Sequence, residues 1–324
     1  MRERDDAASS RNTQRPPQTQ AAAPAPVPAP APQVLAATQP TPAAAAPAPR
    51  AQPTSADPGE AWLDDVADGD RLAALREAIT AGRTEVYLEP ILTLVDQRPR
   101  HYEVQVRPKA ADGETFGDNA ELHTELDGTG LLPLLDRVRI ARVAVVARRL
   151  AERGRDSSIF SGFSGESLVD DAFLNDFANA YHDRDSFASQ LVLTFPLADV
   201  RSMTPRERAA LEDMRDLGFR FALDHVTDLD VDFEDLRRNG FLFIKLDADV
   251  FLQGLPTSGG LIPADDICRY LAELGMTLVV GHIEDEAKFA RIFGFGVLFG
   301  QGQLFGGPRL VKTEPAAPRR TAAA

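Results

Sequence analysis

The chain has 324 residues and a formal net charge of −14. This length fits one large domain or two small ones, and an apolar share of 44% supplies enough side chains for a sizeable core. The negative charge repels phosphate backbones and argues against nucleic-acid binding, although a local basic pocket for a small anion stays compatible with it.

The cysteine count and the apolar runs bear on the compartment. Cys268 is the only cysteine, so no intramolecular disulfide forms, and its apolar helical surroundings favour a buried thiol over a nucleophile. No apolar run approaches the roughly 20 residues of a membrane span. The charged N-terminus lacks the apolar core of a signal peptide. We therefore expect a cytoplasmic protein with no membrane segment.

Composition divides the chain into four parts. Residues 1–58 are rich in Ala, Pro, Gln and Thr, which predicts a disordered arm with local polyproline character. We interpret this arm as a flexible tether, with a docking segment as the alternative. Residues 59–69 are expected to be a linker or short helix, residues 70–312 the folded domain, and residues 313–324 a disordered tail.

Apolar spacing predicts alternating helices and strands in the folded domain. The first helix carries Leu72, Leu75 and Ile79 and ends at Gly82. Strands are expected at residues 85–91, 101–107, 158–163, 190–195, 219–224, 241–247, 276–280 and 296–299. Further helices are expected at residues 131–150, 205–218, 233–238, 263–274 and 284–293.

Two of these helices carry additional signals. In the helix at 131–150, one face is expected to hold Leu134, Leu135, Val138, Val145 and Val146. The helix after Thr204 begins with a predicted capping box, in which Thr204 caps the helix and Glu207 reaches back.

The alternation itself predicts the fold. Parallel strands need a connection of helix length between them, so we expect parallel pairing. About eight such strands predict an α/β fold of the TIM-like (β/α) barrel type. Reactive groups in such barrels lie at the carboxyl ends of the strands, where this chain has Glu103, Asp224 and Lys245.

Several stretches together resemble the EAL domain, the family of cyclic-di-GMP phosphodiesterases. Residues 102–107 are similar to its name-giving motif and keep Glu103 and Arg107. Other similar stretches are residues 71–91, 127–137, 244–247 and 300–306. The resemblance covers about residues 70–312 and implies a barrel of the EAL type.

The resemblance implies hydrolysis assisted by two divalent cations, which carboxylates and an asparagine hold. Glu103 stands at the first ligand position, and Asp224 keeps the first of two consecutive aspartates, with His225 in place of the second. An asparagine and two glutamates of the ligand set fall at Gly162, Phe195 and Gly281. Most of the implied metal cage is therefore missing.

Glu103, Asp224 and Lys245 remain as a vestigial catalytic set. No catalytic residue and no cofactor is expected; Mg²⁺ or Mn²⁺ would accompany only residual activity, with at most a weak site at Glu103 and Asp224. By the resemblance Lys245 orients the attacking water, and the alternative is an ion pair with Asp224 or Asp247. A zinc site at His225 and His282 is a minor alternative.

The implied nucleotide-binding residues are Glu89, Glu103, Arg107, Asp224, Lys245 and Gln301. The Arg107 guanidinium can hold a phosphate bidentately, and the alternative is a structural ion pair at the barrel mouth. Glu89 replaces a glutamine that contacts the guanine edge; it accepts hydrogen bonds there but adds negative charge. Gly307 replaces an arginine of the family, which removes another positive contact.

These residues predict a catalytically inactive EAL-like regulatory module, a pseudo-enzyme of cyclic-di-GMP signalling, that serves as nucleotide receptor, protein-interaction module or both. The alternative is a nucleotide-independent protein-binding scaffold, which suits the N-terminal arm and the altered loop at residues 226–229. Residual cyclic-di-GMP phosphodiesterase activity is the least favoured hypothesis. The protein partner stays unassigned, and a homodimer stays open.

Overall fold

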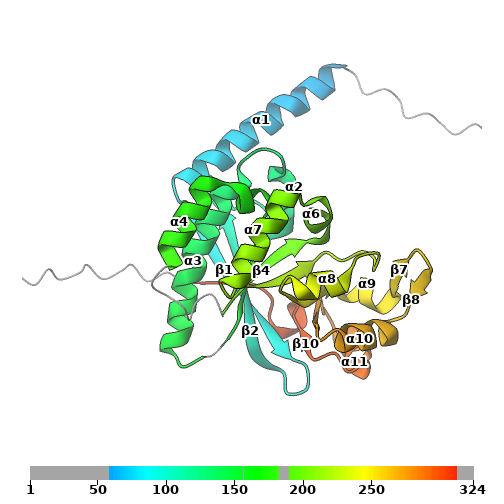
Figure 1. Cartoon of the computed structure of the whole chain (residues 1–324). Coiled ribbons are helices and arrows are strands. Elements are labelled where there is room, and N and C mark those ends of the chain that lie inside the picture. The colour runs from blue at the N-terminus through cyan, green and yellow to red at the C-terminus, as the bar shows by residue number, and fades with distance from the viewer. Residues whose placement is uncertain (1–57, 156, 182–189, 312–324) are drawn as a thin grey trace, which may run out of the picture. The chain divides into compact units, whose positions relative to one another are not determined.

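The computed structural model describes residues 58–155, 157–181 and 190–311 (Figure 1). Residues 1–57 of the predicted arm and the predicted tail at 313–324 lie outside the described residues, whereas Pro58, the last residue of that arm, begins a helix. Helix α1 runs without a break from Pro58 to Thr80, so it includes the stretch that we interpreted as a linker or short helix.

Eight strands of the described chain close into a barrel, as the alternation predicted. Their order around the ring ends with β10 pairing back to β1. The strands are β1 (Thr84–Thr93), β2 (Arg98–Pro108), β3 (Ile159–Gly162), β4 (Leu191–Pro196), β5 (Arg220–Asp224), β6 (Phe241–Asp247), β9 (Thr277–Gly281) and β10 (Phe299–Gly300). Strand β11 (Arg309–Leu310) pairs with β1 as an additional neighbour.

The prediction of parallel pairing throughout is wrong for β1. This strand runs antiparallel to both β2 and β10, whereas the other neighbouring strands of the ring are parallel. Only residues 94–97 connect β1 to β2, and so short a connection makes a hairpin, which is antiparallel by necessity. Gln97 takes a positive φ of 52° in this turn.

Helices surround the barrel on its outside, and α3 and α4 lie side by side (Figure 1), with α3 packed against β3. The described helices after α1 are α2 (Asn119–Leu126), α3 (Leu132–Glu152), α4 (Asp171–Tyr181), α6 (Leu197–Ser202), α7 (Pro205–Asp216), α8 (Phe233–Arg238), α9 (Ala248–Gln253), α10 (Ala264–Glu273) and α11 (Glu286–Gly294). Short elements complete the fold: η1 (Glu166–Val169), η2 (Gln303–Phe305) and the hairpin of β7 (Leu255–Thr257) and β8 (Gly260–Ile262).

Two features of the helices test the sequence predictions. The capping box at Thr204 and Glu207 is confirmed, with both reciprocal hydrogen bonds present. The face predicted for α3 is wrong at Val145, which is 41% exposed, whereas Val146 and Arg139 are buried.

The strands separate an inner core from an outer one. Inside the barrel, one layer of apolar side chains consists of Ile91, Phe160, Val192, Ala222, Phe243, Val279 and Phe299. The outer core lies between strands and helices and receives the alternate residues of the same strands, such as Leu193, Leu223 and Ile244. This alternation decides which residues reach the barrel mouth.

Candidate functional site

Three charged side chains meet at the carboxyl ends of β2, β5 and β6. Lys245 Nζ donates hydrogen bonds to Glu103 Oε1 at 2.9 Å and to Asp224 Oδ2 at 2.7 Å. Gln301, just past β10, donates from Nε2 to the other Glu103 oxygen at 2.7 Å. Glu103, Lys245 and Gln301 are all buried. Of the two ion-pair alternatives for Lys245, the structure shows the one with Asp224.

This arrangement favours the charged forms of Asp224 and Lys245. Burial alone raises the pKa of Asp224, but the charges of Lys245 and His225 more than offset it, so the pKa is lowered. For Lys245, burial acts to lower the pKa, and the attraction of Asp224 and Glu103 raises it well above its usual range. The ammonium therefore stays protonated and pairs with both carboxylates from within the protein.

Glu89 is a carboxyl of this site whose pKa lies near neutrality. It stands opposite Glu103 in the β1–β2 pairing and is only 7% exposed. Burial, and then repulsion from Glu103, raise the pKa of Glu89 to about 7. Its hydrogen bond from Gln105 Nε2 is long, at 3.4 Å. The Glu89 carboxyl is therefore protonated in part of the molecules around neutral pH.

Arg107 presents a guanidinium with no carboxylate partner among the residues that the structure describes. Its Nη2 donates to Gln105 Oε1 at 2.9 Å, and the group lies over the Tyr87 ring, 4.7 Å from the centroid. Its buried Nε has no hydrogen-bond partner. Among the described residues, Arg107 therefore forms no close ion pair of the kind that the structural alternative expects.

Small residues occupy three further positions around the mouth. Gly162 and Thr194 are paired neighbours on β3 and β4 that line a hollow beside Glu103, and Gly281 lines the cleft from the end of β9. None of them offers a carboxylate or an amide.

The assignment of Phe195 to a ligand position is wrong. Phe195 is fully buried in the outer core, where its ring contacts those of Phe163, Phe221 and Phe241. Because side chains alternate along a strand, the residue of β4 that faces the mouth is its neighbour Thr194. The position expected to carry a glutamate therefore carries a hydroxyl.

The donor set does not fit a pair of divalent cations. Both oxygens of Glu103 accept from Lys245 or Gln301, and those of Asp224 accept from Lys245 and from the His225 backbone N–H at 2.8 Å. Within the described residues, no group of three or more His, Cys, Asp or Glu side chains is placed to hold a metal. His282 is 74% exposed and bonds to Asp247. We therefore derive no step through a metal ion.

All the residues predicted to bind a nucleotide line one cleft of about 400 Å³: Glu89, Glu103, Arg107, Asp224, Lys245 and Gln301. Asp118, Asp247 and Glu284 also line it and add negative charge. A side hollow of about 360 Å³ adjoins the cleft; Glu103, Asn119 and Asp224 line both.

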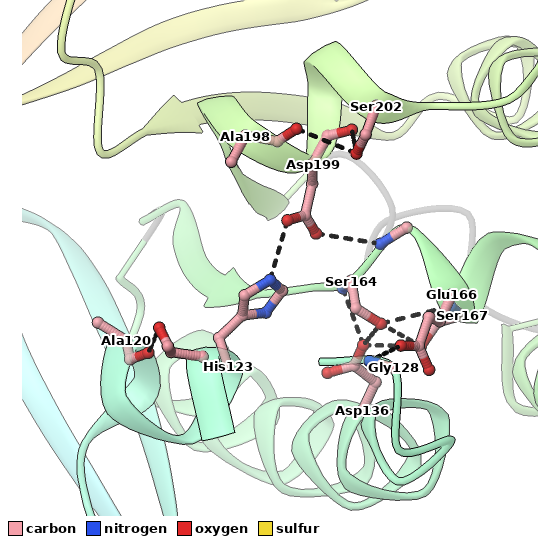
Figure 2. A network of polar contacts seen from close by, with 12 residues as sticks. Ala120, His123, Gly128, Asp136, Ser164, Glu166, Ser167, Ala198, Asp199 and Ser202 are labelled. Atoms are coloured by element: carbon pink, nitrogen blue, oxygen red, sulfur yellow. Dashed lines mark hydrogen bonds and ion pairs between the residues drawn. The ribbon is translucent and has the colours of Figure 1, made fainter. Parts of the chain in front are cut away.

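The sequence prediction missed the polar residues that support this side hollow. Figure 2 shows His123 of α2 bonded to Asp199 of α6 at 3.0 Å. It also shows the fully buried Asp136 accepting hydrogen bonds from Ser164 and Ser167. Two charged residues, Asp136 and Arg139, on the otherwise apolar face of α3 were the signal in the sequence.

Two further observations concern the rest of the described chain. Burial and then Asp265 raise the pKa of the Cys268 thiol to about 11, so the thiol stays protonated and is a poor nucleophile. Across the described residues, every helix is too short or too polar to cross a bilayer.

Fold and site together define a class, a TIM-like barrel with an antiparallel first strand and a polar site at the carboxyl ends of its strands. The model of the EAL domain matches residues 72–308. The chain therefore belongs to the EAL domain family, whose members act in cyclic-di-GMP signalling.

Similar proteins include an uncharacterised 76.5-kDa protein of Thiocystis violacea, 24% identical over 210 residues, which are 64% of this chain and 29% of that protein. The chain thus spans less than a third of that relative's length. The EAL domain of Xanthomonas citri FimX, in complex with c-diGMP, has a TM-score of 0.63 at 16% identity over 78% of this chain and 99% of that one. The FimX EAL domain of Pseudomonas aeruginosa, bound to c-di-GMP, has a TM-score of 0.60 at 22% identity over 74% and 96%. These likenesses concern the fold.

Proposed function

We propose that this chain is a non-hydrolysing EAL module that binds cyclic-di-GMP and reports it through contact with a protein partner. The observation that carries the loss of hydrolysis is the lining of the mouth, where Gly162, Thr194 and Gly281 supply no carboxylate or amide side chain for a cation. The two carboxylates that remain, Glu103 and Asp224, already pair with the Lys245 ammonium at 2.9 Å and 2.7 Å.

Nucleotide binding is supported by the composition of the cleft. Arg107 has no carboxylate partner among the described residues, so its charge is free to pair with a phosphate. Glu89 carries a proton part of the time at neutral pH, and the protonated acid both donates and accepts at a base edge. The two FimX EAL domains, which share the fold, hold cyclic-di-GMP in their solved structures.

A nucleotide-independent scaffold is the second candidate, and the charge of the cleft favours it. Asp118, Asp247 and Glu284 surround the space that a ligand with two negative phosphates would enter. Uncompensated like charges weaken such binding at short range. Both candidates act through protein contact, either with another protein or with a second copy of this chain.

Titration calorimetry of the full chain with cyclic-di-GMP, with and without Mg²⁺, separates the two. A receptor gives saturable heat in both conditions and forms no linear dinucleotide with Mg²⁺ or Mn²⁺. Arg107→Ala removes the phosphate contact and is expected to weaken binding at least tenfold, since a charge-assisted hydrogen bond contributes about 1.5–3 kcal/mol. Arg98→Ala, at the exposed start of the same strand, is the matched control.

The other outcomes of this experiment are equally informative. A wild-type chain that gives no heat at high nucleotide concentration supports the scaffold instead. Release of the linear dinucleotide, measured by chromatography, contradicts both candidates and supports residual phosphodiesterase activity instead.

A further inference from the structure

A side chain from outside the barrel strands borders the mouth at Gly162. A Cβ placed on Gly162 would lie 3.7 Å from Asn119 Nδ2 and 3.8 Å from Arg139 Nη1. Asn119 is the first residue of α2, and Arg139 lies on α3. An amide from α2 therefore stands beside the strand position at which the family resemblance implies an asparagine.

Arg139 is fixed in place by a buried network. Its side chain is 2% exposed, and Nη1 donates to Asp136 Oδ1 at 2.9 Å. The other Asp136 oxygen accepts from Ser164 N and Oγ, both at 2.9 Å, and from Ser167 Oγ at 2.7 Å (Figure 2). The guanidinium therefore has a single orientation, set by a carboxylate with every oxygen occupied.

This guanidinium decides how the Asn119 amide is turned. Arg139 Nη2 donates to Asn119 Oδ1 at 3.3 Å. A guanidinium has donors only, so the amide oxygen faces Arg139 and the amide nitrogen is left for other partners. Asn119 Nδ2 makes one long bond, 3.5 Å, to Val104 O, and its second hydrogen has no acceptor among the residues that the structure describes.

We infer that Asn119 is a ligand-contacting residue of the cleft, which donates a hydrogen bond to an acceptor oxygen of the bound nucleotide, and that Arg139 positions it. Asn119 lines both the cleft and the side hollow, so its amide is within reach of a ligand in either. The inference rests on the proposed nucleotide binding and adds a contact from α2 to it. In this orientation the amide oxygen accepts a hydrogen bond from Arg139, so it is not turned toward a cation in the cleft.

Calorimetry with cyclic-di-GMP on Asn119→Ala and Asn119→Asp tests the inference. Losing one donor is expected to weaken binding about tenfold in Asn119→Ala. Asn119→Asp keeps an acceptor for Arg139 but has no donor, so it is expected to bind more weakly still. Asn175→Ala, on the exposed surface of α4, is the matched control, and thermal unfolding verifies that each variant is folded.

Each outcome decides between a donor and a structural role. If Asn119 only supported Arg139, the aspartate would serve equally well, so wild-type affinity in Asn119→Asp overturns the inference. Unchanged affinity in both variants overturns it as well and leaves the proposed receptor intact. A wild-type chain without saturable binding removes the receptor and this contact together.

Discussion

Single side chains decide what the barrel mouth of this protein can do. The Lys245 ammonium lies between Glu103 and Asp224, and Gln301 donates a hydrogen bond to the second oxygen of Glu103. Buried charges are tolerated only when they are paired and hydrogen-bonded, and here the pairing is internal. The carboxylates that a metal would need are thus stable in the folded protein with a lysine as their partner.

Glu89 makes stability depend on pH, and Glu89→Gln tests this. Its folded-state pKa of about 7 lies above the ordinary value of 4.5, so ionisation is harder in the folded state than in the unfolded one. The stability contributed by protonated Glu89 is present at low pH and lost as the pH rises from about 4.5 through 7. The glutamine cannot ionise, so the variant is expected to be more stable by up to about 3 kcal/mol at pH 8 and unchanged near pH 4.

Urea unfolding of wild type and Glu89→Gln across this pH range measures the difference. The free energies of unfolding of the two proteins are expected to be equal near pH 4 and to differ increasingly as the pH rises. Parallel curves would show that the Glu89 carboxyl ionises equally easily in the folded and unfolded states. Glu85→Gln, on the same strand and bonded to Lys109, is the control for a carboxyl with a lowered pKa.

At the level of the element, the alternation of side chains along β4 decides which of its residues line the site and which pack in the core. Thr194 faces the mouth and Phe195 faces the helices, although the two are neighbours in sequence. The same rule puts Asp224 inward and Leu223 outward on β5. A single position along a strand therefore separates a site residue from a core residue.

Two glutamate substitutions on β4 test this assignment. Phe195→Glu buries a carboxylate among aromatic rings and removes a large apolar group, which is expected to cost more than 4 kcal/mol and to prevent stable folding. Thr194→Glu places the same carboxylate on the face of β4 that lines the side hollow, away from the aromatic core, and is expected to leave a folded protein. Circular-dichroism melting of both variants measures this, and Phe195→Leu controls for the loss of volume. Equal stability of the two glutamate variants would contradict the assignment.

For the whole molecule, the described core lies within one compact unit, residues 56–324. Both shells of the barrel core and all residues of the cleft belong to this unit. The ion pairs of the site lie there as well, since Lys245, Glu103 and Asp224 come from strands of the same ring. The described core and the proposed nucleotide-binding cleft therefore both belong to this unit.

A fragment of residues 56–324 is accordingly expected to fold as the full chain does. Its melting temperature should lie within about 2 °C of that of the full chain, because it keeps the complete described core. Its affinity for cyclic-di-GMP should match as well. Differential scanning calorimetry and the binding titration measure both quantities. A fall of about 5 °C or more would show that residues 1–55 stabilise the barrel.

The sequence by itself determined the elements and the family. Apolar spacing gave the bounds of β6 and α8 residue for residue, because such patterns are local. The motifs around Glu103, Lys245 and Gln301 pointed to the EAL family, since each lies within a few consecutive residues. The outward side of Phe195 was missed, because a shift of one residue reverses the face of a strand. The antiparallel direction of β1 was missed, because the alternation of helices and strands was taken to imply parallel pairing, although the short connection at residues 94–97 requires a hairpin.

Only the tertiary structure decided which residues of the site contact one another. Glu103 and Lys245 are 142 positions apart in the chain, and their hydrogen bond exists only because the ring closes. Asn119 and Arg139 come from two different helices and meet beside Gly162 on a third element. Local sequence encodes which residues are available, but distances between remote segments are set by packing of the whole barrel. Those distances bring Lys245 against Glu103 and Asp224 and so form the ion pairs of the barrel mouth.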